Sequence, residues 1–197
     1  MKPILLSLLI TFSMTTEISQ AQDPLPYSSI PDSPSSFTAG NVTGRMIDGL
    51  GFRYYWATEG LTESDLQHKP SQDARSLMET LEHIYRLTLV MVNVPQNIVN
   101  EGSADYSLLE FEELRSKSLR NMKYASDLLK GSTNSEVETY QVVFKRGDNQ
   151  HPYPMWNLIN GQISDAIWHT GQVVLMRRAA GNPINPKVNV FTGKLNK

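Results

Sequence analysis

Three residues on two predicted helices have the types and the spacing needed to bind a divalent metal ion. Asp165 and His169 are four positions apart, which places a carboxylate and an imidazole one turn apart on the same helix face. Gln162 and Gln172 fall on the same line of that helix. His83 borders the apolar stripe of an earlier segment and can point into the same core. Two histidines and one carboxylate form a facial ligand set with positions open for water or substrate.

The same spacing is also typical of a hydrogen-bonded polar pair without a metal, and this alternative stays open. Glu79 lies one turn before His83 and could be a further ligand, an acceptor for that imidazole, or a surface charge. The other two histidines, His68 and His151, lie in polar segments that we expect to be exposed loops. The predicted metal ligands are therefore His83, Asp165 and His169.

Four segments with helical periodicity must position these residues. Each has apolar or aromatic side chains at steps of three and four, over about 36–59, 73–95, 107–130 and 154–181. Asp73 is an expected N-cap, Ser107 and Glu110 form an expected capping box, and Pro154 fits a first helical turn. No such helix can bury its stripe alone. The sequence therefore predicts an all-α four-helix bundle over residues 37–182.

The connections around these helices are less regular. The link from Gly131 to Tyr153 is long enough to cross the bundle between the third and fourth helices. Within it, Thr139 to Lys145 alternates weakly, but no second strand is convincing enough to pair with it. Residues 183–197 are expected to be an irregular C-terminal tail. Two basic residues near the end of the last helix, Arg177 and Arg178, are expected to face its negative dipole end.

The first 21 residues have the pattern of a secretory signal peptide. Lys2 is followed by an apolar run that is too short to span a bilayer, and Ser19 and Ala21 are the small residues of a cleavage site. An uncleaved N-terminal anchor is the alternative. We expect cleavage after Ala21, a secreted or periplasmic protein without membrane contact, and a Pro/Ser-rich flexible lead-in over residues 22–36.

Composition excludes several other classes of function. The 197 residues include 18 Lys+Arg and 20 Asp+Glu, and this balance, with no basic block, argues against a nucleic-acid partner. The absence of cysteine excludes disulfides, zinc-thiolate clusters, iron-sulfur sites and cysteine nucleophiles. No glycine-rich phosphate loop occurs. Any metal must therefore be bound by nitrogen and oxygen ligands.

Three segments of the chain resemble the DinB/YfiT-like superfamily. DAIWHTGQVVLMRRAAG, residues 165–181, is similar to the family's fourth-helix signature, in which two histidines spaced by four precede Gly-Gln and an arginine-rich turn. SLMETLEH, residues 76–83, is similar to its second helix, and LTESDL followed by Lys69-Pro70 is similar to the connector before that helix. The resemblance covers about residues 38–181.

This resemblance implies a four-helix bundle in which three histidines bind a divalent metal such as nickel or zinc. By position, His83 matches the first ligand and His169 the third, whereas Asp165 stands where a histidine is usual. A carboxylate still coordinates, but it shifts the preference toward harder ions. The residues alone do not distinguish nickel, zinc, iron and manganese.

The sequence therefore favours a metal-dependent enzyme of hydrolase type that acts on an unknown small-molecule substrate, with one divalent metal ion as cofactor. A non-catalytic bundle that binds a metal or small ligand is the alternative, and the resemblance also implies a thiol-dependent S-transferase. Catalytic residues besides the ligands are not assigned. A homodimer could use the helix face that bears Tyr54, Tyr55 and Trp56.

Overall fold

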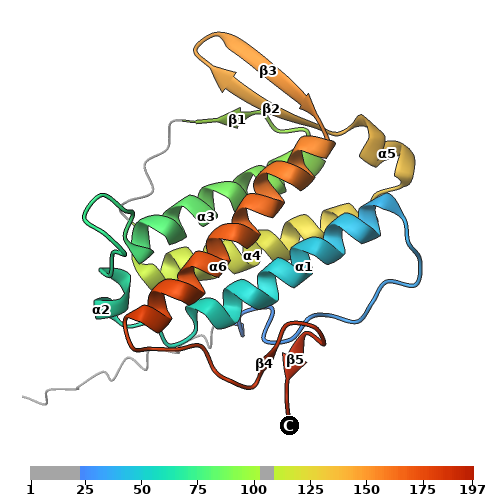
Figure 1. The fold of residues 1–197 in the computed structure, drawn as a ribbon. Coiled ribbons are helices and arrows are strands. Elements are labelled where there is room, and N and C mark those ends of the chain that lie inside the picture. The colour runs from blue at the N-terminus through green and yellow to red at the C-terminus, as the bar shows by residue number, and fades with distance from the viewer. Residues whose placement is uncertain (1–22, 103–108) are drawn as a thin grey trace, which may run out of the picture.

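The computed structural model describes residues 23–102 and 109–197, and this part of the chain is mostly helical. Four long helices pack side by side, α1 with α4 and α6, and α3 with the same two helices (Figure 1). They are α1 (Ala39–Thr58), α3 (Leu77–Asn93), α4 (Phe111–Gly131) and α6 (Ser164–Ala179). Shorter helical segments are α2 (Glu63–Leu66), α5 (Asn134–Thr139) and the 3₁₀ turn η1 (Val94–Gln96). The fold is not wholly α-helical, because short strands accompany the helices.

The start of α3 follows capping chemistry more closely than apolar periodicity. α3 begins at Leu77 rather than near Asp73, because Ser76 and Glu79 form a capping box in which each side chain accepts from the other residue's backbone N–H. α4 begins after Glu110, which makes no side-chain cap hydrogen bond. The expected partner in that capping box, Ser107, lies outside the described residues.

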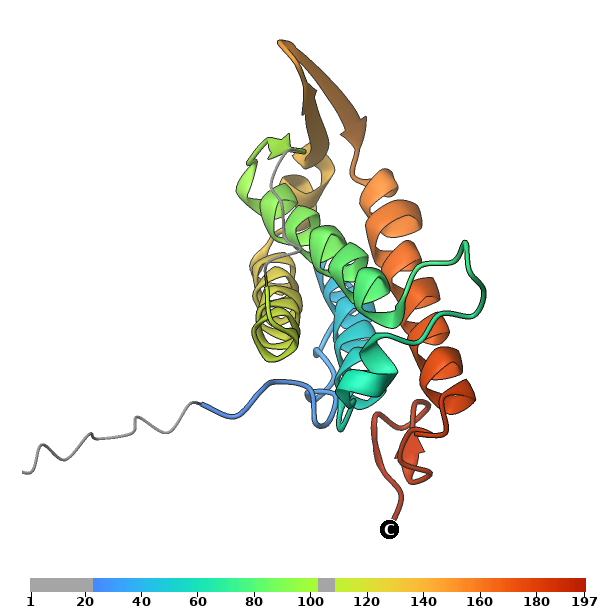
Figure 2. The same cartoon turned by 90° about the vertical axis from the view of Figure 1, so that its left-hand side faces the viewer.

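A small sheet lies at one end of the helices. β2 (Gln141–Arg146) pairs antiparallel with β3 (Asn149–Pro154), and β1 (Asn100–Glu101) pairs parallel with β2. The β2–β3 hairpin projects beyond the helix ends (Figure 2). The expectation that no second strand exists is wrong. Every residue of β3 is exposed, so no apolar alternation marked the strand, and its edge position tolerates its two prolines.

The last helix begins later than predicted and contains a π-helical segment. Pro154 ends β3 instead of starting a helix, and η2 (Leu158–Ile163) is π-helical and leads directly into α6. A π turn has wider spacing than an α turn and so changes which side chains face the core. Leu158 is buried here, whereas Ile159, which α-helical periodicity placed on the inner face, is only half-buried.

The segment expected to be a flexible lead-in packs against the helices. Tyr27 is 4% exposed, and its ring lies against Gly51, where an added Cβ would be 2.4 Å from a ring carbon. Its hydroxyl donates a 3.1 Å hydrogen bond to the fully buried Asp48, which also accepts from Ser126 and pairs with Lys130. Burial and the Asp48 charge raise the pKa of Tyr27 well above its ordinary value. Tyr27 therefore anchors this segment, together with Leu25, which packs against the core.

The C-terminal tail is more ordered than predicted. β4 (Val188–Asn189) and β5 (Lys194–Leu195) form a short antiparallel hairpin. The amide of Ile30 donates to the carbonyl of Gly193 at 2.9 Å, so this hairpin contacts the N-terminal segment. The C-terminal hairpin is thus tied to the N-terminal segment, which Tyr27 ties to α1.

No helix among the described residues is long and apolar enough to span a membrane. The predicted signal peptide and its cleavage after Ala21 lie in residues 1–22, outside the described part of the chain.

Candidate metal centre

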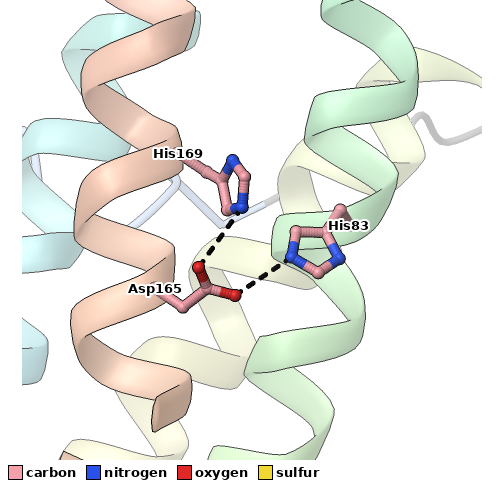
Figure 3. Close-up of side chains that lie close together, drawn as sticks. All are labelled: His83, Asp165 and His169. Carbon is pink, nitrogen blue, oxygen red and sulfur yellow. Dashed lines mark hydrogen bonds and ion pairs between the residues drawn. The ribbon is translucent and has the colours of Figure 1, made fainter. Parts of the chain in front are cut away.

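The three predicted ligands lie together between α3 and α6. Asp165 lies between the two imidazoles, with Oδ2 at 3.1 Å from Nε2 of His83 and Oδ1 at 3.3 Å from Nε2 of His169 (Figure 3). The two imidazole rings meet edge to face, with their centroids 4.6 Å apart. One potential ligand atom from each residue lies within 4.8 Å of the others, so the group could hold a metal ion.

The two contacts of Asp165, which use different carboxylate oxygens, are compatible with a shared ion and also with hydrogen bonds. Ligand atoms about 2.1 Å from an ion are about 3.0 Å apart at right angles and about 3.4 Å apart in a tetrahedral site. The two contacts of Asp165, at 3.1 and 3.3 Å, lie in that range. The Asp165 side chain is 38% exposed, which leaves the site open to water and to small molecules.

One tautomer of His169 suits metal binding through Nε2. Nδ1 of His169 lies 2.8 Å from the Gln172 amide oxygen, and this oxygen accepts a hydrogen bond in the tautomer that carries its proton on Nδ1. In a neutral imidazole, Nε2 then has a lone pair that faces the Asp165 carboxylate at 3.3 Å. Two acceptors at this distance repel each other unless a cation lies between them or the imidazole takes a second proton. The neutral form of this arrangement fits a bound metal ion.

The environment of His83 favours its neutral, coordinating form. Burial lowers the pKa of His83, and the nearby His169 and Arg75 charges act in the same direction, against the opposing effect of the Asp165 hydrogen bond. A neutral imidazole is the form that binds metal. The lowered pKa therefore favours coordination by His83.

The π-helical segment lies immediately before the ligands of the last helix. η2 ends at Ile163, two residues before Asp165, and π turns within α-helices are frequent at functional sites. Of the two glutamines expected on the ligand line, Gln172 contacts His169, whereas the buried Oε1 of Gln162 has no hydrogen-bond partner among the described residues. Of the two predicted glutamine neighbours of the ligands, only Gln172 on α6 therefore makes a hydrogen bond to one of them.

Two other candidates do not join the trio. Glu79 is exposed and accepts a 2.6 Å hydrogen bond from the Ser76 amide, so its carboxylate caps α3. This bond and the contact with the Ser76 hydroxyl lower the pKa of Glu79. His151 is exposed, as expected, but it lies on β3 opposite Phe144 rather than in a loop.

The structure also shows functional candidates that the sequence did not. A cavity of about 690 Å³ adjoins His169, and its wall includes Arg75 and His68. His68 is half-buried there, so the expectation of a solvated loop histidine is wrong. The segment between α2 and α3 extends beside α6 (Figure 2) and supplies both residues. No periodic pattern marks such a connector, and only the packing places it at the site.

Arg177 has a structural role different from the predicted one. It is 3% exposed, and its guanidinium donates to the carbonyls of Trp56, Ala57 and Glu59 at the end of α1. Its Nε also donates to the Asn182 carbonyl. Burial lowers the pKa of Arg177. The residue therefore caps the C-terminus of another helix.

The proposed dimer face is not available as predicted. Tyr54 is fully buried in the core, and burial raises its pKa to about 12. Tyr55 and Trp56 are half-buried, and the Trp56 indole donates to the Ser28 carbonyl. These three side chains cannot form a common exposed surface.

Comparisons with protein-family models, with curated proteins and with solved structures found no match for this chain.

Proposed function

We propose that this chain is an exported, DinB-like four-helix-bundle protein that binds one divalent metal through His83, Asp165 and His169, and that it is a hydrolase-type enzyme. The observation that carries the metal assignment is the grouping of His83, Asp165 and His169, each of which has a ligand atom within 4.8 Å of the others. The resemblance to the DinB motifs points to the same three positions. Export rests on the signal-like pattern of residues 1–21.

The residues around the trio have separate tasks in this proposal. A bound divalent ion supplies Lewis-acid chemistry, which polarises a carbonyl group and makes water a competent nucleophile near neutral pH. Gln172 orients the His169 ring, as outer hydrogen-bond partners of ligating histidines do. Of the described cavity residues outside the trio, His68 is the one whose side chain can both accept and donate a proton. We assign the proton transfer to His68.

Metal analysis tests the first part of this proposal. The protein is purified without a histidine tag, reconstituted with zinc, nickel, manganese or iron(II), and measured for metal per chain. We expect one ion in the wild type and a large loss in the His83→Ala, Asp165→Ala and His169→Ala variants. His151→Ala is the matched control, because this histidine is exposed on β3. The metal site is wrong if no reconstituted wild-type sample retains a divalent ion.

Turnover tests the second part. Ester, amide and thiol-transfer substrates are screened with and without a chelator, and the hydrolase assignment predicts ester or amide cleavage that the chelator abolishes. Thiol transfer alone identifies an S-transferase, although an exported protein has little access to a cytosolic thiol cosubstrate. Metal binding without chelator-sensitive turnover identifies a binding module. His68→Ala should lower kcat while leaving the metal content unchanged.

A further inference from the structure

The cavity beside the trio has the size and lining of a small-molecule site. Its volume of about 690 Å³ is in the range of ligand pockets. His169 belongs both to its wall and to the metal trio, so a molecule in the cavity lies against the proposed reaction centre. The remaining wall comes from the connector before α3, from Thr80 on α3, and from the C-terminal half of α6.

Most of the surface area of this wall is apolar, and half of its ten described residues have no polar side-chain group. The side chains without polar groups are Pro70, Ala74, Leu175, Met176 and Ala179. Leu175 is 64% exposed, although it lies on a helix that buries other aliphatic residues completely. Contact with an apolar ligand would remove this surface from water, at a gain of about 25 cal/mol per Å². The lining therefore favours a ligand with a hydrocarbon part.

One permanent charge lies among these apolar groups. Arg75 lines the cavity and, within the described residues, makes no hydrogen bond or ion pair. No carboxylate is among the described residues of the cavity wall. A guanidinium offers a planar fork of donors that matches a carboxylate. A single arginine matches the charge of a carboxylate better than that of a doubly charged phosphate.

We propose that this cavity binds a medium-chain organic carboxylate, with Arg75 on the carboxylate and Leu175, Met176 and Ala179 along the chain. The inference rests on the proposed function in one respect, namely that the ligand is the substrate or product of the metal trio. It names the substrate class as acyl compounds that carry a free carboxylate and an apolar chain. Binding itself requires only the residues of the cavity wall.

Octanoate is the probe for this proposal, titrated by calorimetry into the full chain. The titration is done on chelator-treated protein, so that the carboxylate cannot bind a metal ion. We expect saturable binding of octanoate, at least about tenfold weaker binding of octan-1-ol, which lacks the charge, and no measurable binding of acetate, which lacks the chain. Leu175→Asp should also abolish octanoate binding, because it places a carboxylate at the cavity.

Arg75→Gln and Arg178→Gln form a matched pair. Both remove one positive charge from an exposed residue, but Arg178 lies outside the cavity wall. We expect Arg75→Gln to weaken octanoate binding at least about tenfold and Arg178→Gln to change it less than about twofold. Thermal melting of each variant checks that it is folded. Equal affinities in the two variants, or no octanoate binding by the wild type, would overturn the proposal.

Metal content measured on samples reconstituted with zinc, nickel, manganese or iron(II) separates this proposal from the proposed function. Arg75-dependent octanoate binding in a protein that holds no divalent ion would refute the metal site and support the carboxylate cavity. Normal metal binding with Arg75-independent octanoate binding would refute the cavity and support the metal site.

Discussion

Nε2 of His83 lies 3.1 Å from Oδ2 of Asp165, although the two residues are 82 positions apart in the chain. This contact joins the middle of α3 to the start of α6 and is completed by His169, one turn further along α6. A metal ion bound by residues of two helices stabilises the packing of those helices, because the ion binds the folded chain and not the unfolded one.

Metal removal should therefore destabilise the protein. At a free metal concentration of about 100 times Kd, binding adds about 2.7 kcal/mol to the free energy of unfolding. We expect urea unfolding to show this difference between metal-loaded and chelator-treated wild type. Asp165→Ala should show no such difference, whereas His151→Ala should retain it. An identical effect of metal on Asp165→Ala would place the ion elsewhere.

Gln172 should control metal affinity without being a ligand. Its amide oxygen accepts from Nδ1 of His169 at 2.8 Å and so holds Nε2 toward Asp165. Loss of such an outer partner costs about 10- to 100-fold in metal affinity. We expect this loss in Gln172→Leu, measured by competition with a chromophoric chelator, and near-normal affinity in Gln172→Glu, which keeps an acceptor. Equal affinity in Gln172→Leu and wild type would refute this role.

The sequence predicts two of the three residues of the trio from a local constraint, whereas His83 is predicted from the apolar stripe of its own helix and from the DinB resemblance. Residues four apart on a helix always share a face, so the Asp165 and His169 pair requires only that α6 be helical. Cavity residues such as Arg75 and His68 are not predictable in this way, because they lie on a connector whose position depends on tertiary packing. The β2–β3 hairpin was missed for another reason, since neither face of β3 is buried.

The Arg177 cap should be among the most important polar interactions for stability. Arg177→Leu leaves the carbonyls of Trp56, Ala57 and Glu59 without this donor, and we expect a loss of about 3 kcal/mol in the free energy of unfolding. The neighbouring Arg178 is exposed, so Arg178→Leu should change stability by less than about 0.5 kcal/mol. Urea titration of both variants measures the contrast, and similar losses in the two would show that Arg177 has no special role.

Tyr27 should anchor the N-terminal segment to the folded domain. Tyr27→Phe removes only the hydrogen bond to Asp48 and should cost about 1 kcal/mol, whereas Tyr27→Ala also empties the site against Gly51 and should cost about 3 to 5 kcal/mol. Limited proteolysis should cut the Tyr27→Ala variant before residue 36 much faster than the wild type. Ser29→Ala is the control, because Ser29 is an exposed residue of the same segment. Rapid cleavage of the wild type at the same positions would contradict the anchoring.

Asp65 should make the fold sensitive to acid. Burial alone would raise the pKa of Asp65, but hydrogen bonds from Asn182 and Thr62 and the Arg177 charge outweigh burial and hold it below the ordinary 3.8. A group with a lowered pKa in the folded state stabilises the fold above the unfolded-state pKa, and this contribution is lost as pH falls through the folded-state value. We expect the wild type to lose stability more steeply than Asp65→Asn as pH falls below about 4. Urea unfolding at a series of pH values measures the two slopes, with the exposed Glu138→Gln variant as control. Parallel curves for the wild type and Asp65→Asn would show that the ionised Asp65 carboxylate does not stabilise the fold through these partners.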